Sequence, residues 1–210
     1  SYARYKAKQY TVTFYDANGS TVLSKQSCSY GEIPAYNGNT PKKGATKQYT
    51  YSFSGWKNAA GQSYSNAMPL PAVTGDDSYT AQFKESEITY TVTWKDQDGT
   101  ILRTDSRVLA GTVPSYGSTM PSKEKDVKFT YTFKGWTDEV SNYNAGIDLP
   151  EVTGDVTYSA LYINTINRYS VTFVDENGTT ILMSRQDYDY GTTNALINKP
   201  ADPAKASTAQ

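Results

Sequence analysis

Tyr10-Thr11-Val12-Thr13-Phe14 is the first of three closely related stretches in this chain of 210 residues. It returns as Tyr90-Thr91-Val92-Thr93-Trp94 and as Tyr169-Ser170-Val171-Thr172-Phe173, at offsets of 80 and 79 residues. In each copy, apolar or aromatic side chains alternate with threonine or serine, which is the pattern of a β-strand that buries one face. A pattern that returns at a spacing of this length indicates a tandem array of small domains.

Further blocks recur in the same order in successive copies. Each first strand is followed by Asp-x-Asn/Asp-Gly, which is typical of a type I turn that ends in a left-handed glycine. The downstream blocks are YSFSGW (51–56) and YTFKGW (131–136), LPAVTG (70–75) and LPEVTG (149–154), and YTAQF (79–83) and YSALY (158–162). The repeat predicts the tail of a preceding copy at residues 1–9, complete modules at 10–89 and 90–168, and a partial third module at 169–210.

Each module is predicted to hold about four strands and no amphipathic helix. In the first module we expect strands at residues 10–15, 21–30, 49–56 and 78–83, with a long proline-containing loop at 31–47. The residues expected in its core are Val12, Phe14, Tyr51, Phe53, Trp56, Leu70, Val73, Ala81 and Phe83. The predicted fold class is mainly β, with small modules arranged as an elongated array.

The third copy differs from the others in two ways. It has one extra residue between Leu182 and Tyr190, which predicts a β-bulge, and a helical turn is expected around residues 194–197. It also lacks the Phe-x-Gly-Trp strand and everything that follows it. We therefore expect this copy to be frayed.

The composition excludes several kinds of partner and chemistry. Lys and Arg number 20 against 21 Asp and Glu, which gives no electrostatic reason to expect nucleic acid or an anionic membrane as partner. The chain has no histidine, so it lacks the usual general base and the commonest metal ligand. Its single cysteine cannot form an internal disulfide. No apolar run approaches the ~18 residues of a membrane span, and no signal peptide opens the chain. The start is interpreted as lying within a longer protein because Tyr2-Ala3-Arg4-Tyr5 resembles the Tyr-x-Ala-x-aromatic end of a repeat.

Three short motifs have both a chemical and a structural interpretation. Asp-x-Asn/Asp-Gly resembles the opening of a calcium loop, but the further oxygen ligands and the closing glutamate are missing, which favours a turn. The Leu-Pro segments at 70–75 and 149–154 have one residue more than a sortase signal and recur inside the modules, which favours a turn before the last strand. Asn18-Gly19-Ser20 and Asn177-Gly178-Thr179 match the N-glycosylation sequon, and asparagine also suits a hairpin turn.

Other side chains are candidates for catalysis or binding. Cys28 has no histidine partner and aligns with Val108 and approximately with Tyr188, which favours a buried packing residue over a nucleophile. No spacing singles out an acid–base pair among the turn and loop carboxylates, which are Asp16, Asp76, Asp77, Asp96, Asp98 and Asp175. The surplus tyrosines either pack between strands or dock a ligand, and strand spacing favours packing for Tyr49, Tyr51, Tyr79, Tyr131 and Tyr158. An internal Lys–Asn isopeptide bond depends on spatial pairing, which the sequence does not identify.

The combination of Tyr-Thr-Val-Thr-aromatic, Asp-x-Asn/Asp-Gly-Thr, Tyr-Thr-Phe-x-Gly-Trp, Val-Thr-Gly-Asp and Tyr-x-Ala-x-Tyr resembles the InlB-type B-repeat, also called the Listeria–Bacteroides repeat. The resemblance extends over nearly the whole chain. It implies small β-grasp-like modules in secreted or wall-associated bacterial surface proteins, in adhesins or stalks. It implies no catalytic residue, metal or cofactor. The modules here are longer than the shortest family members because of the loop with prolines and glycines.

The sequence therefore predicts a non-enzymatic, monomeric stalk or spacer segment of a bacterial surface protein, located outside the cell at its surface or wall and without membrane insertion. Two alternatives stay open. One is an adhesion module that binds a host or microbial surface glycan or protein through exposed aromatic residues and the loops at 31–47 and 111–128. The other is an accessory repeat of a secreted enzyme.

Overall fold

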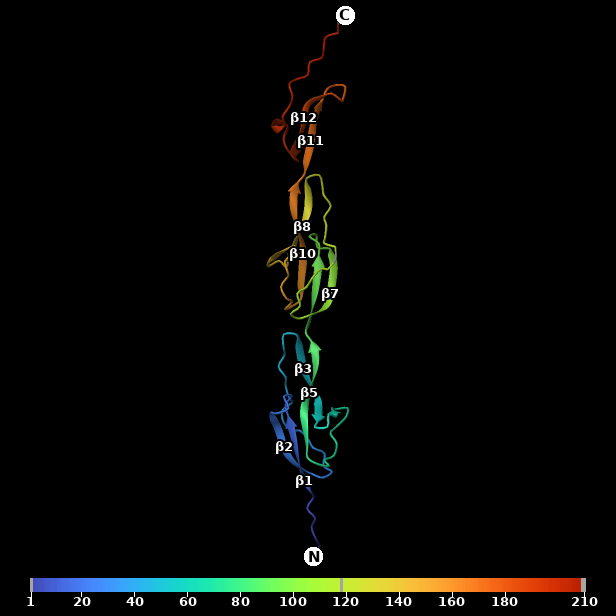
Figure 1. The fold of residues 1–210 in the computed structure, drawn as a ribbon, viewed down its shortest axis with the longest axis vertical. Coiled ribbons are helices and arrows are strands. Elements are labelled where there is room, and N and C mark those ends of the chain that lie inside the picture. Colours follow the sequence, from blue (N-terminus) through green and yellow to red (C-terminus); the bar gives the residue numbers. More distant parts are fainter. Residues whose placement is uncertain (1, 118, 209–210) are drawn as a thin grey trace. The chain divides into compact units, whose positions relative to one another are not determined.

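The computed structural model describes residues 2–117 and 119–208, and these residues form three separate β-sheets in chain order (Figure 1). The strands of the first sheet are β1 (Gln9–Tyr15), β2 (Val22–Ser29), β3 (Tyr49–Asn58), β4 (Ser63–Tyr64) and β5 (Asp77–Glu87). Those of the second are β6 (Thr89–Lys95), β7 (Ile101–Leu109), β8 (Phe129–Thr137), β9 (Asn142–Asn144) and β10 (Val156–Ile166). The third is a hairpin of β11 (Arg168–Val174) and β12 (Ile181–Asp189), followed by the short 3-10 helix η1 (Asn194–Leu196). The prediction of a mainly β chain of small tandem units is confirmed.

The two five-stranded sheets share one topology. Their strand orders are β2-β1-β5-β3-β4 and β7-β6-β10-β8-β9. Within the first sheet, β1 pairs antiparallel with β2 and parallel with β5, so the first strand and the last long strand are neighbours. This is the β-grasp-like arrangement, in which a loop at residues 31–47 takes the place of a crossing helix. The sequence predicted four strands in each sheet and missed the short edge strands β4 and β9, which have two and three residues.

The Phe-x-Gly-Trp block is a β-bulge. The pairing of β3 with β5 shifts between Phe53 and Gly55, so that Phe53 and Trp56 face the same side although they are three positions apart. Their ring centroids lie 5.3 Å apart. Gly55 has a φ of +141°, and a Cβ atom on it would lie 1.9 Å from the carbonyl oxygen of Tyr64. Only glycine allows this approach between the two backbones.

The core of the first sheet contains most of the residues predicted for it. The buried members are Val12, Phe14, Cys28, Trp56, Val73, Tyr79 and Ala81, and Phe53, Leu70 and Phe83 pack at its border. The prediction for Tyr51 was wrong. Tyr51 pairs with Glu85, is half-buried and is not among the residues that pack against this core. Instead, the ammonium group of Lys43 lies 3.9 Å from the centroid of the Tyr51 ring, a cation–π contact.

Tyr79, near the start of β5, and Tyr158, at the equivalent position of β10, are packing residues, as predicted. Tyr79 is 2% exposed and Tyr158 1% exposed, and each ring stacks on the aromatic residue of the neighbouring parallel strand. Tyr49, Tyr51 and Tyr131 are only half-buried. The tyrosine surplus therefore serves packing at some positions and covers the surface at others.

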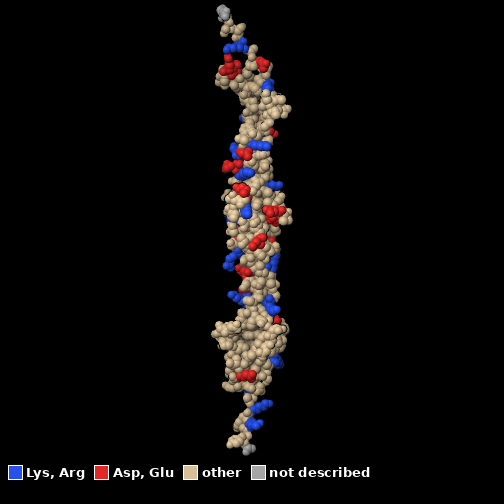
Figure 2. All heavy atoms as spheres, turned by 180° about the vertical axis from the view of Figure 1, so that it is seen from behind, with Lys and Arg blue, Asp and Glu red and all other residues tan. Residues whose placement is uncertain are grey.

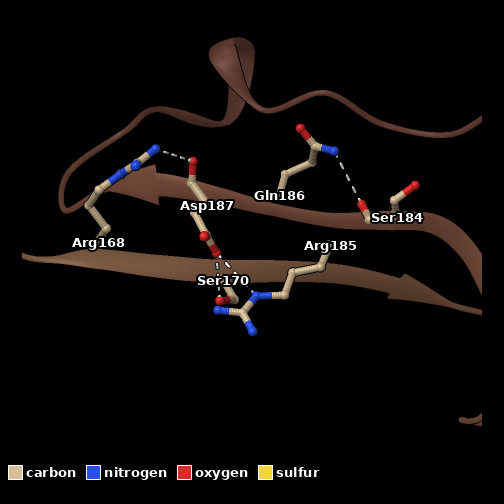
Figure 3. A network of polar contacts seen from close by, with 6 residues as sticks. All are labelled: Arg168, Ser170, Ser184, Arg185, Gln186 and Asp187. Carbon is tan, nitrogen blue, oxygen red and sulfur yellow. Dashed lines mark hydrogen bonds and ion pairs between the residues drawn. The ribbon is translucent and has the colours of Figure 1, made fainter.

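The third copy folds as a hairpin with irregular pairing, and Figure 3 shows polar contacts on its two strands. The register of β12 shifts between Met183 and Gln186, which confirms the bulge predicted for this segment, and η1 confirms the predicted helical turn. The carboxylate of Asp187 accepts hydrogen bonds from the Ser170 hydroxyl at 2.7 Å and from Arg185 Nε at 3.2 Å. These polar contacts lie at the surface.

The hairpin is expected to exchange its backbone amide protons faster than the sheet strand β1. Val171 and Phe173 are only half-buried, whereas the equivalent Val12 and Phe14 are both 0% exposed, and a two-stranded hairpin is marginally stable in water. Hydrogen exchange followed by NMR or mass spectrometry would compare residues 169–181 with 10–22. Equal protection of the two segments would contradict this expectation.

Candidate functional site

The most site-like feature of the described residues is an open groove of about 780 Å³ beside the first sheet. It lies between the loop at residues 31–47 and the segment around β4. The residues that line it are Ile33, Pro34, Ala35, Tyr36, Gly38, Thr40, Pro41, Phe53, Ser54, Gly55, Trp56, Tyr64, Ser65, Asn66, Ala67, Pro69 and Leu70. None of these lining residues has a charged side chain.

One wall of the groove is held to the core by aromatic packing. The centroid of the Tyr36 ring lies 4.9 Å from that of Trp56 and 5.4 Å from that of Phe14. The Tyr36 hydroxyl donates a hydrogen bond of 2.7 Å to the carbonyl oxygen of Asn39, which closes the loop on itself. Pro34 at the base of the loop is buried. The loop is therefore an anchored wall rather than a free connection.

The chemistry of the groove suits binding, because aromatic rings and small polar groups line it together. The rings of Tyr36, Phe53 and Tyr64 are half-buried and present apolar surface, while Ser65 and Asn66 are exposed and supply hydroxyl and amide groups. Such a combination of aromatic surface with a few polar groups is common in ligand sites. The sequence pointed to the loop at 31–47, but the opposite wall from Tyr64 to Leu70 was not recognised because no pattern links it to the loop.

The Asp-x-Asn-Gly turns use their side chains within the turn itself. Asn18 Oδ1 accepts hydrogen bonds of 2.9 Å from the backbone N–H groups of Ser20 and Thr21. Asp16 Oδ1 accepts one of 2.7 Å from the backbone N–H of Ala17. Within the described ranges, no group of three or more histidine, cysteine or acidic residues is arranged to hold a metal ion.

The two Leu-Pro segments tie the long loops to the strands. In the first, the Val73 carbonyl accepts a 2.8 Å hydrogen bond from Gly31 N–H, and Val73 N–H donates one of 2.8 Å to the Glu32 carbonyl. Val152 makes the same pair of bonds with Gly111 and Thr112, at 2.9 Å each. Both valines are buried. The chain bends at residues 74–75 and 153–154, just before β5 and β10, where the sequence predicted a turn.

Each of the candidate carboxylates accepts a hydrogen bond. Asp76 Oδ1 accepts a 2.8 Å hydrogen bond from the backbone N–H of Thr11, and Asp155 does the same for Thr91. The other partners are the backbone N–H of Ser78 for Asp77, the Tyr162 hydroxyl for Asp96, the backbone N–H of Thr100 for Asp98 and that of Glu176 for Asp175. Asp76 and Asp155, which end the two Val-Thr-Gly-Asp blocks, therefore make equivalent contacts in the two sheets.

Cys28 is 1% exposed and pairs across the hairpin with Tyr10. Burial, with a smaller effect of the nearby Glu32 carboxylate, raises the pKa of the Cys28 thiol. A thiol that stays protonated is a poor nucleophile, so the interpretation of Cys28 as a packing residue fits its surroundings.

The charged side chains are distributed with both signs mixed. On the face shown in Figure 2, lysine and arginine are interspersed with aspartate and glutamate. No helix of the described residues has the length and apolar character required to span a membrane.

The buried tyrosines predict an alkaline transition. Burial, reinforced by Asp77, raises the pKa of Tyr79 to about 12, and burial, reinforced by Tyr143, raises that of Tyr158 to about 12. An unfolded tyrosine titrates near ~10, so the folded state holds these protons more tightly than the unfolded state. Their contribution to stability is therefore complete below about pH 10 and is lost as the pH rises toward about 12.

The test is the free energy of unfolding in urea as a function of pH. We expect it to fall between about pH 10 and 12, and the double variant Tyr79→Phe/Tyr158→Phe to show a shallower fall. An equally steep fall in the double variant would mean that other groups cause the transition.

Known proteins similar to this chain were found by family, by sequence and by structure. The model of the Listeria-Bacteroides repeat domain matches residues 90–160 and 169–208. A protein of Evansella cellulosilytica described as a Gly-rich membrane protein is 25% identical over 205 residues, which are 97% of this chain but only 21% of that protein. Among solved structures, domains 3–4 of the Streptococcal High Identity Repeats in Tandem (SHIRT) from a cell surface protein match 75% of this chain and 99% of their own, with 12% identity and a TM-score of 0.42.

The two segments that match the family model make up more than half of the chain, and each contains the strand and turn blocks with which a copy begins. The sequence prediction of the family is thus confirmed. The chain is a tandem segment that belongs to the Listeria-Bacteroides repeat domain family.

Proposed function

We propose that this chain is a non-enzymatic stalk or spacer segment of a bacterial surface protein, located at the cell surface or wall, with modules that begin at Tyr10, Tyr90 and Tyr169. The observation that supports it most is the shortness of the links. β5 ends at Glu87 and β6 begins at Thr89, while β10 ends at Ile166 and β11 begins at Arg168. A link of one residue has little freedom to let successive modules fold back on each other.

Each of the two linking residues, Ile88 and Asn167, also forms hydrogen bonds with both its backbone N–H group and its backbone carbonyl. Ile88 N–H donates to the Gln48 carbonyl at 2.7 Å, and the Ile88 carbonyl accepts from Ala110 N–H at 2.8 Å, all within one compact unit. In the other unit, Asn167 N–H donates to the Lys128 carbonyl and the Asn167 carbonyl accepts from Tyr190 N–H, both at 2.8 Å. These bonds favour a spacer whose links bend little over a chain whose modules move independently.

Small-angle scattering of the chain tests this proposal. A compact module of ~80 residues adds roughly 30 Å of length, so we expect a maximum dimension that grows with each module and a monomeric mass. A variant with a Gly/Ser insertion after Ile88 serves as the control and should give a broader distribution of dimensions. A compact particle for the unmodified chain would refute the spacer function.

The groove supports a second candidate function, which is binding of a neutral oligosaccharide. The described lining lacks charge and combines half-buried aromatic rings with hydroxyl and amide groups, which suits the apolar faces and hydroxyl groups of a neutral sugar. A charged glycan would lose hydration there without gaining an ionic partner. In this function the segment would be an adhesion module as well as a spacer.

A substitution taken from the second copy tests this binding. Ser54 lines the groove, and its equivalent in the second copy is Lys134, so Ser54→Lys is compatible with the fold. We expect saturation-transfer NMR with a panel of neutral hexose oligosaccharides to show contact with the unmodified chain and a loss with Ser54→Lys. Ser20→Lys, in the exposed turn, is the matched control and should bind as before. No transfer from any sugar of the panel would reject this function.

A further inference from the structure

In each five-stranded sheet, the strands where the chain enters and leaves are parallel neighbours. Val12, Thr13, Phe14 and Tyr15 of β1 pair with residues 77–80 of β5. In the second sheet, residues 92–95 of β6 pair in the same way with residues 156–159 of β10. The chain enters at the start of the first strand and leaves from the far end of the last, so the two ends lie at opposite ends of one parallel pair.

We propose that this pair is a mechanical clamp, which makes each five-stranded sheet resistant to tension along the chain. This inference rests on the proposed spacer function, because a spacer of a surface protein transmits the forces between its two ends. Tension would pull β1 and β5 past each other lengthwise. All hydrogen bonds between the strands are then loaded together, whereas in a peeling geometry they break one after another.

A hydrogen bond to an aspartate side chain reinforces the clamp in each sheet. The Asp76 carboxylate accepts the 2.8 Å hydrogen bond from Thr11 N–H directly beside the paired segment, and Asp155 and Thr91 repeat this contact in the second sheet. The bond joins the N-terminal part of β1 to the residue before β5. It therefore resists the same sliding motion as the backbone pairing.

Stacked aromatic rings cover both pairs of strands. Phe14 of β1 stacks on Tyr79 of β5, with centroids 5.4 Å apart and an interplanar angle of 26°. Trp94 of β6 stacks on Tyr158 of β10 at 5.2 Å and 29°. Phe14 and Trp94 are 0% exposed, so one face of the ladder is shielded from the water that would compete for its hydrogen bonds.

The C-terminal hairpin provides an internal contrast. β11 pairs antiparallel with β12, and Arg168 at the start of β11 lies opposite Asp189 at the end of β12. Tension on these two ends separates neighbouring residues, so the hydrogen bonds break in sequence from one end. We therefore expect the hairpin to open at a lower force than either sheet.

Single-molecule force spectroscopy of the chain, held at its two termini, tests the clamp. We expect two high-force unfolding events, one for each five-stranded sheet. Each event releases the segment between the two clamped strands. For residues 12–80 this segment is roughly 240 Å long when fully extended. The hairpin should extend before both events. Sheets that unfold at or below the force of the hairpin would overturn the inference.

A second pulling direction separates clamp geometry from stability. The second direction uses the variant Cys28→Val, in which Gln9→Cys and Tyr30→Cys introduce the two attachment points. Tension between them peels β2 from β1, because Gln9 lies opposite Ser29. Valine is the residue of the second copy at the position of Cys28. The inference requires a several-fold lower force in this direction for the same folded sheet, and equal forces in both directions would refute it. Scattering decides independently whether the chain is a spacer, so an extended chain that is weak in both directions would refute only the clamp.

Discussion

Replacement of Gly55 by alanine is expected to unfold the first sheet under conditions in which the unmodified chain is folded. The added Cβ would lie 1.9 Å from the carbonyl oxygen of Tyr64, and the φ of +141° strains any side chain. The obstacle is backbone in an edge strand that is hydrogen-bonded to β3, so it cannot move without loss of that pairing. We expect a cost of about 3 to 5 kcal/mol from clash and strain, against a total of about 4 to 12 kcal/mol for a domain of ~80 residues.

Fluorescence of Trp56 during urea denaturation measures the effect, in a background where Trp94 and Trp136 are replaced by phenylalanine. Gly75→Ala is the matched control, because Gly75 has an ordinary φ and nothing within 4 Å of its added Cβ. This control should leave stability unchanged or raise it slightly. Similar stabilities of Gly55→Ala and Gly75→Ala would contradict the role of the bulge. Gly135, with a φ of +149° and the Tyr143 carbonyl oxygen at 1.9 Å, predicts the same outcome in the second sheet.

The second large effect is expected for Trp94→Ala. Trp94 is 0% exposed, and its ring centroid lies 4.9 Å from that of Trp136, 5.2 Å from Tyr158 and 5.5 Å from Tyr116. Removal of the ring leaves a cavity at the centre of an aromatic cluster, which costs about 3 to 5 kcal/mol. Hydrogen exchange by mass spectrometry would locate the loss of protection in β6, β8 and β10.

Trp94→Phe distinguishes packing from hydrogen bonding at this position. The indole N–H of Trp94 donates a 2.9 Å hydrogen bond to Asp105 Oδ2, and the equivalent residues Phe14 and Phe173 have no such donor. Asp105 keeps its ion pair with Arg103 at 2.6 Å. We expect Trp94→Phe to cost about 1 to 2 kcal/mol, clearly less than alanine. Equal losses for the two variants would show that the hydrogen bond, and not the ring, stabilises the sheet.

Much of this protein could be predicted from its local patterns. The alternation in Tyr10-Thr11-Val12-Thr13-Phe14 identified β1, and the turn residues at 16–19 marked the hairpin that follows it. The extra residue of the third copy located its bulge, and the replacement of Cys28 by Val108 indicated packing. These features depend on residues that are neighbours in the chain or that can be compared between copies.

The groove could be predicted only in part. The loop at 31–47 was recognised from its prolines and glycines, but its opposite wall around Tyr64 was not, because no sequence pattern connects segments that meet only in space. Tyr51 was placed in the core because it alternates correctly with Phe53. Alternation shows which face of a strand a residue occupies, and it does not show how far the neighbouring strands extend beside it.

The sequence by itself determined the repeat, the order of its strands and turns, and the family. The tertiary structure alone decided that β1 and β5 are parallel neighbours, that Asp76 bonds to Thr11, and that Gly55 must lack a side chain. The physical reason is the range of the interactions. Side-chain periodicity and turn chemistry act over a few residues, whereas strand pairing, backbone clashes and the groove arise between segments that are distant in the chain and meet only after folding.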